Sequence, residues 1–68
     1  MNLVVNGLPE DLPDGAELGE LLARHGHAPT ARGVAVAVNG SVVRRADWPS
    51  HPLAEGDAVE LLVAVQGG

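Results

Sequence analysis

Two Asn-Gly pairs constrain the fold of this chain more than any other feature of its sequence. Asn6-Gly7 follows an apolar run at residues 3–5. Asn39-Gly40 separates the apolar segment 34–38 from a second strand-like segment at residues 41–43. Both central residues of a type I′ turn need a positive φ, which asparagine and glycine tolerate best. The sequence therefore predicts two β-hairpins.

The partner strand of the first hairpin is predicted at residues 8–12. Pro9 and Pro13 lack the N–H group that a central strand would donate, so this strand is expected at an edge of the sheet. Between the hairpins, Leu18, Leu21 and Leu22 share one face at helical spacing and predict a single amphipathic helix. Asp14 is expected to cap its start and Gly26 to end it.

The second half of the chain is predicted to contain a turn followed by a long strand. Trp48-Pro49 and His51-Pro52 disfavour a regular strand and favour a turn or a short 3₁₀ segment, which Leu53 is expected to anchor. Residues 58–65 are almost continuously apolar, which is typical of a central strand. We therefore expect an α+β fold in which one helix packs on one face of a small mixed sheet.

Composition restricts the function. With 68 residues, the chain is expected to be a single domain over residues 1–68, too small for a roomy enzyme cleft. Its net charge of −5 disfavours nucleic acid, and no run approaches the length of a membrane span. Cysteine is absent, which fits a reducing cytoplasm. We expect no metal, because His25 and His27 straddle Gly26 rather than sharing a helix face.

Gly67 and Gly68 end the sequence, and we interpret them as the working end of the protein. Residues without a Cβ fit a narrow channel and leave the terminal carbonyl carbon open to attack. Residues 65–68, which include Gln66, are expected to form a mobile tail that reaches about 13 to 14 Å when extended. The tail is therefore predicted to be the substrate of a partner enzyme.

Residues along the whole chain carry a resemblance to a known family: Val5-Asn6-Gly7, Leu18, Glu20-Leu21-Leu22, 34–40, Val42-Val43, Arg45, Trp48, Leu53, Glu55-Gly56-Asp57, Val59-Glu60 and Gly67-Gly68. In these residues the sequence resembles the ThiS family of thiamin-pathway sulfur carriers from end to end. The resemblance implies a ubiquitin-like β-grasp fold with parallel first and last strands at the centre of the sheet. One departure is Glu17, which stands where the family usually has Thr or Ser at the helix start, so that capping must come from elsewhere.

The resemblance also implies a function for Gly68. An adenylating, E1-like activating enzyme would use ATP to activate its carboxylate, and a sulfur-donor protein would supply the sulfur of a thiocarboxylate. Thiazole synthase would then receive that sulfur. The chemistry agrees, because an ionised carboxylate is a poor electrophile until a leaving group is attached. The sequence has no phosphate-binding loop, so the partner is expected to bind ATP and this chain no cofactor.

Strand alternation predicts where a partner docks. If Val59, Leu61 and Val63 face the helix, then Leu62 and Ala64 face outward, near the start of the tail. Val4 of the first strand is expected to join them. Val4, Leu62 and Ala64 are therefore predicted to form an exposed apolar patch that holds a partner.

Two alternatives stay open at this point. Similar Gly-Gly carriers serve molybdopterin synthesis, cysteine synthesis and tRNA thiolation, although the molybdopterin type usually has a proline-containing motif before Gly-Gly. Modules of the TGS type share the strand pattern and act as RNA-binding or regulatory domains. The acidic charge and the absence of lysine argue against RNA.

Overall fold

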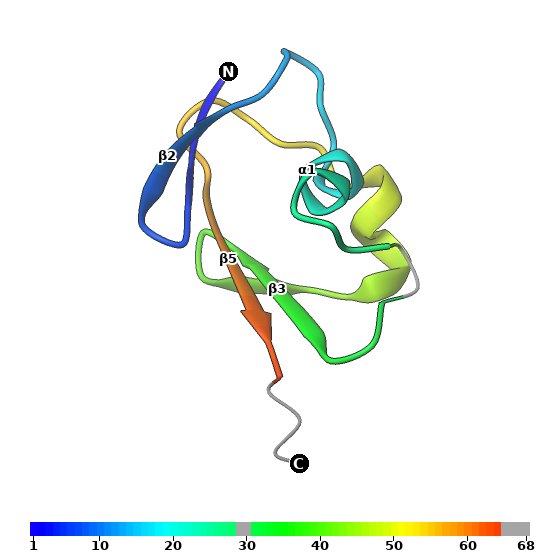
Figure 1. Cartoon of the computed structure of the whole chain (residues 1–68). Coiled ribbons are helices and arrows are strands. Elements are labelled where there is room, and N and C mark those ends of the chain that lie inside the picture. The colour runs from blue at the N-terminus through cyan, green and yellow to red at the C-terminus, as the bar shows by residue number, and fades with distance from the viewer. Residues whose placement is uncertain (29–30, 65–68) are drawn as a thin grey trace.

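The computed structural model describes residues 1–28 and 31–64, which form five strands, one α-helix and one 3₁₀ helix (Figure 1). The elements in chain order are β1 (Asn2–Val5), β2 (Leu8–Asp11), α1 (Leu18–Arg24), β3 (Val34–Val38), β4 (Ser41–Val43), the 3₁₀ helix η1 (Arg45–Ser50) and β5 (Ala58–Val63).

All five strands belong to one mixed sheet in the order β2-β1-β5-β3-β4. The first strand, β1, and the last strand, β5, are parallel neighbours at the centre, and every other pairing is antiparallel. The edge position of β2 and the central position of β5 confirm the sequence-based predictions. Both helices lie on the same side of the sheet, and within residues 1–28 and 31–64 no helix covers its other face (Figure 1).

Both Asn-Gly pairs form the predicted hairpin turns. Asn6 and Asn39 have φ values of 50° and 51°, and the following glycines, Gly7 and Gly40, have values of 81° and 83°. Two successive positive φ angles are the signature of a type I′ turn. The first turn joins β1 to β2, and the second joins β3 to β4.

The helix α1 begins differently from the prediction. Its N-cap is Glu17, whose side chain makes no capping hydrogen bond, and the backbone N–H of Leu18 donates instead to the carbonyl of His51 at 2.8 Å. Asp14 lies 3.2 Å from the amino group of Met1, so its prediction as the cap was wrong. His51, the residue after η1, thus accepts a hydrogen bond from the first residue of α1. This agrees with the expectation that a distant part of the chain caps the helix.

The end of α1 agrees with the prediction. The C-cap is His25, and Gly26 follows with a φ of 80°, the left-handed conformation that commonly terminates a helix. The N–H groups of Gly26 and His27 donate to the carbonyls of Ala23 and Leu22 at 3.0 and 2.9 Å. These bonds satisfy carbonyl groups that the last helical turn would otherwise leave free.

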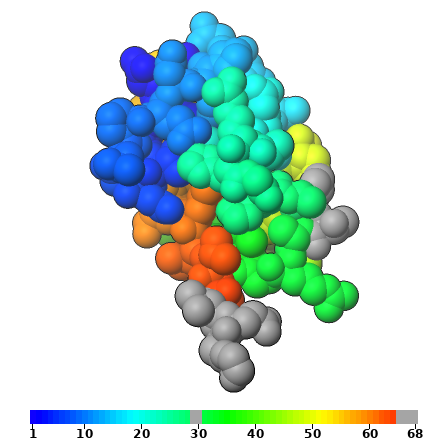
Figure 2. All heavy atoms as spheres, viewed as in Figure 1, coloured from blue at the N-terminus to red at the C-terminus, as the bar shows by residue number. Residues whose placement is uncertain are grey.

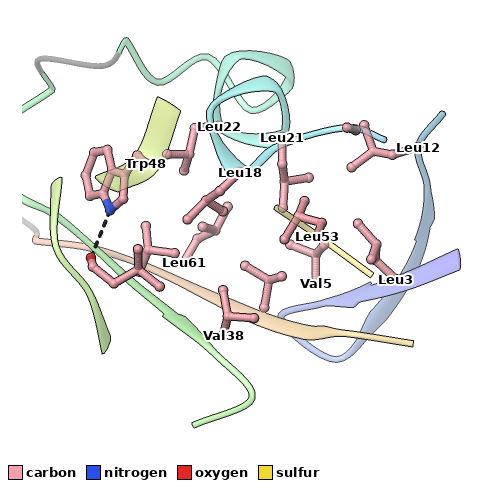
Figure 3. Close-up of a cluster of buried hydrophobic side chains, with 14 residues drawn as sticks. Leu3, Val5, Leu12, Leu18, Leu21, Leu22, Val38, Trp48, Leu53 and Leu61 are labelled. Atoms are coloured by element: carbon pink, nitrogen blue, oxygen red, sulfur yellow. Dashed lines mark hydrogen bonds between the residues drawn. The ribbon is translucent and has the colours of Figure 1, made fainter. Parts of the chain in front are cut away.

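The hydrophobic core lies between the sheet and the two helices (Figure 3). The leucines of α1 point toward the strands, and Leu53 is buried among them, as predicted. Trp48 of η1 is 2% exposed, and its indole N–H donates to the carbonyl of Val43 at 2.9 Å. This bond satisfies the only polar atom of the largest core side chain. The residues labelled in the figure are Leu3, Val5, Leu12, Leu18, Leu21, Leu22, Val38, Trp48, Leu53 and Leu61.

Gly19 permits the close contact between α1 and η1. A Cβ at this position would lie 3.2 Å from the Cα of Pro49 and 3.4 Å from the carbonyl oxygen of Trp48. Both are backbone atoms, which cannot move aside as the tip of a flexible side chain can. Glycine lowers the stability of a helix by about 1 kcal/mol relative to alanine, but here it allows the backbones of α1 and η1 to pack closely.

Candidate functional site

The root of the C-terminal tail is the end of β5, the central strand of the sheet. β5 runs to Val63, and the N–H of Ala64 then donates to the carbonyl of Gly33 at 2.7 Å. Figure 2 shows this end of the strand, in orange and red, at the surface of the molecule. The predicted sulfur-carrying residue Gly68, its neighbours Gly67 and Gln66, and Val65 lie outside the described residues.

The end of β5 is more exposed than its alternation pattern predicts. Val59 and Leu61 are buried against the helix side of the sheet, as expected. Val63 has the same orientation but is 56% exposed, so its prediction as a covered residue was wrong. It pairs with Val34 at the end of the sheet, beyond the part that α1 covers (Figure 1). Apolar side chains are therefore accessible on both faces of the sheet at the end of β5.

Leu62 and Ala64 occupy the exposed positions predicted for them. Leu62 is 64% exposed and pairs across the sheet with Ala35, which is exposed as well. A shallow hollow of about 390 Å³ lies at this corner of the sheet. Its lining residues are Gly33, Val34, Ala35, Leu62, Val63 and Ala64. We call these six residues the tail-root surface.

Val4 does not belong to the same patch, and this part of the prediction was wrong. It is 40% exposed on the outer face, but its partner in the parallel pair with β5 is Ala58. Leu62 lies four positions after Ala58 along β5, which is about 13 Å of strand. The exposed carboxylate of Glu60 lies between them on the same face. Parallel pairing places the start of β5, and not its end, beside β1.

Val34 and Ala35 of the tail-root surface were not identified from the sequence. Both lie in β3, which pairs with β5 in an antiparallel register that brings Val34 opposite Val63. Alternation within one strand indicates which residues share a face, but it does not reveal which strand lies beside it. The apolar run at residues 34–38 indicated a strand. Only the strand order of the sheet shows that this strand lies beside the end of β5.

Asn6 also contacts the strand that leads to the tail. Its side chain accepts a hydrogen bond from the N–H of Leu61 at 2.8 Å and donates one to the carbonyl of Leu61 at 3.2 Å. Sequence reasoning assigned Asn6 only to its turn. The side chain therefore holds β5 from one side, whereas Gly33 holds Ala64 from the other.

The described residues offer little else that points to chemistry. Among residues 1–28 and 31–64, no group of three or more His, Asp or Glu side chains is arranged to hold a metal ion. The ring of His25 instead contacts the carboxylate of Glu10 at 2.8 Å, joining the end of α1 to β2. No helix within the described ranges has the length and apolarity needed to span a membrane.

Comparison with known proteins agrees with this geometry. The sequence model of the ThiS family matches residues 3–68. The sulfur carrier protein ThiS of Thermus thermophilus is 38% identical over 64 residues, which are 94% of this chain and 95% of that protein.

Two structures of the thiamine biosynthesis protein ThiS from Geobacter metallireducens are also similar. The crystal structure has a TM-score of 0.80 at 37% identity and covers all of both chains. The solution NMR structure has a TM-score of 0.79 at 38% identity, covering all of this chain and 88% of the other. The mixed five-stranded sheet with one α-helix is thus a ubiquitin-like β-grasp fold, and this chain belongs to the ThiS family of sulfur carriers.

Proposed function

We propose that Gly68 carries sulfur as a C-terminal thiocarboxylate and donates it for thiazole formation in thiamin biosynthesis. The observation that supports this proposal best is the match to the ThiS family, which extends through Gly67 and Gly68. The position of β5 agrees with it, because this central strand ends at the exposed Val63.

The proposed chemistry has three steps, and all occur in partner enzymes. The Gly68 carboxylate attacks the α-phosphorus of ATP, which releases pyrophosphate and forms an acyl-adenylate. The terminal sulfur of a persulfide on a sulfur-donor protein then adds to the acyl carbon and displaces AMP, which gives an acyl disulfide. A partner thiol cleaves the S–S bond of that acyl disulfide, which releases the Gly68 thiocarboxylate and leaves a disulfide between the thiol and the donor. Adenylation is required because a carboxylate oxygen is a poor leaving group and AMP is a good one.

This chain acts as a carrier and not as a catalyst in the proposed scheme. An E1-like activating enzyme binds ATP and this chain needs no bound cofactor, while thiazole synthase receives the sulfur. We place these reactions in the cytoplasm, where ATP is available. Four residues follow Ala64, and a fully extended chain of that length spans about 13 to 14 Å. The tail can therefore enter an active site while the body of the carrier stays outside.

We propose the tail-root surface as the place where the activating enzyme holds the carrier. Leu62 and Ala64 supply exposed apolar area on the outer face of the sheet, and Val63 supplies it on the opposite face. Exposed apolar side chains beside a reactive end suit partner binding. Val4 lies at the other end of the outer face, so it can contribute only to a partner that covers most of that face.

The function is tested by measuring the intact mass of the protein after incubation with the activating enzyme, ATP and a sulfur donor. We expect a mass increase equal to the difference between sulfur and oxygen, located at Gly68 by fragmentation. A variant that lacks Gly68 is the control and should show no increase. A mass increase in that variant, or one located at an internal residue, would contradict the proposal.

A further inference from the structure

The two Asn-Gly turns are chemically reactive as well as conformationally defined. Both stand in the same tripeptide, Val-Asn-Gly, at residues 5–7 and 38–40. In this pair the backbone nitrogen of glycine attacks the side-chain amide carbon of asparagine, because glycine has no Cβ to crowd the approach. The two sites have matched neighbours, so a difference in their reactivity reports on the folded structure around each asparagine.

The reaction is deamidation, and its only co-reactant is water. The glycine nitrogen forms a bond to Cγ of the asparagine, the bond from Cγ to Nδ2 breaks, and the amide nitrogen leaves as ammonia with the proton of the glycine N–H. Water then opens the five-membered imide at one of its two carbonyl carbons, which leaves an aspartate or an isoaspartate. The asparagine side chain must first leave its hydrogen bonds and turn toward the backbone, so those bonds control the rate.

Asn6 is held firmly at both ends of its amide. Oδ1 accepts the N–H of Leu61 and Nδ2 donates to the carbonyl of the same residue, and both bonds are partly buried. Leu61 itself is 7% exposed and lies in the central strand β5. Water competes poorly for hydrogen bonds that are partly buried, so the Asn6 side chain rarely leaves this position.

Asn39 is held by exposed contacts. Oδ1 accepts the N–H of Ala58 and Nδ2 donates to the Asp57 carboxylate, each at 2.9 Å, and both bonds are open to solvent. A charged acceptor strengthens the second bond, but water competes for it and salt screens its charge. The turn leads into β4, a three-residue strand at the edge of the sheet. The Asn39 side chain therefore detaches more readily than that of Asn6.

We infer that Asn39-Gly40 is a deamidation site of the folded protein, whereas the fold protects Asn6-Gly7. A group that reacts only from an open form does so at a rate proportional to the population of that form. The stronger hold on Asn6 should therefore slow its reaction at least about fivefold relative to Asn39. This inference rests on the two turns alone and does not depend on whether Gly68 carries sulfur.

Deamidation at position 39 places a new negative charge beside Asp57. The Asn39 amide donates to this carboxylate, whereas a carboxylate at position 39 can only accept hydrogen bonds. The other oxygen of Asp57 accepts the N–H of Ala54, so the repulsion acts on the turn that precedes β5. The bonds from Asn6 to Leu61 are not involved. The change is thus confined to the start of β5, away from the end that leads to the tail.

The inference is tested by incubating the full-length protein at mildly alkaline pH and locating deamidation by peptide mass spectrometry. Arg24 and Arg32 lie between the two sites, so trypsin places Asn6 and Asn39 on different peptides. Each event replaces NH₂ by OH and changes the peptide mass by that difference. We expect Asn39 to react at least about fivefold faster than Asn6 in native buffer, and the two rates to agree within about twofold in concentrated urea.

Three results would overturn the inference. The first is equal rates at the two sites of the folded protein, or faster reaction at Asn6. The second is no reaction at Asn39 in native buffer over a period in which the urea sample reacts. The third is the same ratio of rates in both solutions, because it would assign the difference to the sequence and not to the fold.

Asp57→Asn and Glu20→Gln are matched variants that change the net charge equally. Asp57→Asn removes the carboxylate that holds the Asn39 amide, whereas Glu20 belongs to α1. Asp57→Asn should speed deamidation of Asn39 about twofold to threefold and leave that of Asn6 within error, and Glu20→Gln should change neither. Equal acceleration at both asparagines in Asp57→Asn would show that global unfolding sets both rates, which would also overturn the inference.

Discussion

The side-chain amide of Asn6 occupies the place of a backbone peptide group beside Leu61. Oδ1 accepts the Leu61 N–H at 2.8 Å, and Nδ2 donates to the Leu61 carbonyl at 3.2 Å. The backbone of β1 ends at Val5, and the Asn6 N–H still donates to the Val59 carbonyl at 2.9 Å. One asparagine thus continues the pairing of β5 toward the tail after its neighbouring strand has turned away.

Asn39 makes a similar contact at the other end of β5. Its Oδ1 accepts the N–H of Ala58 at 2.9 Å, and its backbone N–H donates to the Ala58 carbonyl at 2.7 Å. Both turn asparagines therefore combine a positive φ with side-chain bonds to the central strand. The two ends of β5 are held by separate turns, which makes their contributions experimentally separable.

We predict that Asn6→Gly frees the end of β5 without disrupting the hairpin. Glycine tolerates the positive φ of this position, so the change removes mainly the two amide hydrogen bonds. The free energy of unfolding should fall by about 1–2 kcal/mol. Hydrogen exchange of the Leu61 amide should become faster by more than global unfolding explains, because its hydrogen-bond acceptor has been lost.

Asn39→Gly is the matched control for this prediction. It removes the equivalent amide from the second turn, so the Ala58 amide should exchange faster and the Leu61 amide should not. If Leu61 exchange is the same in Asn6→Gly and the unaltered protein, the side-chain bonds of Asn6 contribute nothing to holding β5.

The amino group of Met1 should make stability depend on pH in the alkaline range. Desolvation lowers its pKa, but hydrogen bonds and charge from Asp14 and Asp11 outweigh this effect and raise the pKa above the ordinary value near 8. The folded state therefore binds the proton more tightly than the unfolded state. This stabilisation is fully present below pH 8 and is lost as the pH rises through the pKa of the folded state.

Urea unfolding followed by Trp48 fluorescence between pH 7 and about 10.5 measures this effect. The chain has no lysine, tyrosine or cysteine, so the Met1 amine is the main group that titrates in that range. The protein acetylated at Met1 is the control, and its stability should change little with pH there. A free energy of unfolding that stays constant from pH 8 to 10 in the unmodified protein would rule out the predicted linkage.

We predict that Leu62→Glu weakens binding to the activating enzyme about tenfold or more while leaving the fold intact. The side chain is exposed, so a charge there costs little in the free carrier, but it would be desolvated against an apolar partner surface. Circular dichroism and thermal melting measure the fold, and calorimetric titration measures the affinity.

Leu8→Glu is the matched control for Leu62→Glu, since Leu8 is 69% exposed and lies in β2, the edge strand on the other side of β1. The same charge should have little effect on affinity there. Unfolding of Leu62→Glu, or equal affinities for both variants, would show that the partner does not dock on the tail-root surface.

Several features followed from short stretches of sequence because local physical chemistry determines them. The Asn-Gly pairs required positive φ values, and the spacing of Leu18, Leu21 and Leu22 required one buried helix face. Proline at position 9 excluded β2 from the centre of the sheet. The resemblance to the ThiS family then supplied the strand order that these local signals leave undetermined.

The tertiary structure decided what depends on contacts between distant residues. His51, which lies 33 positions after Leu18, satisfies the start of α1, so Asp14 was free to pair with Met1. Parallel pairing placed Val4 beside Ala58 and far from Leu62, and the limited reach of α1 left Val63 exposed. Periodicity along one strand specifies only which face a side chain occupies. Strand register and the area that a helix covers depend on packing across the whole sheet, which no single segment encodes.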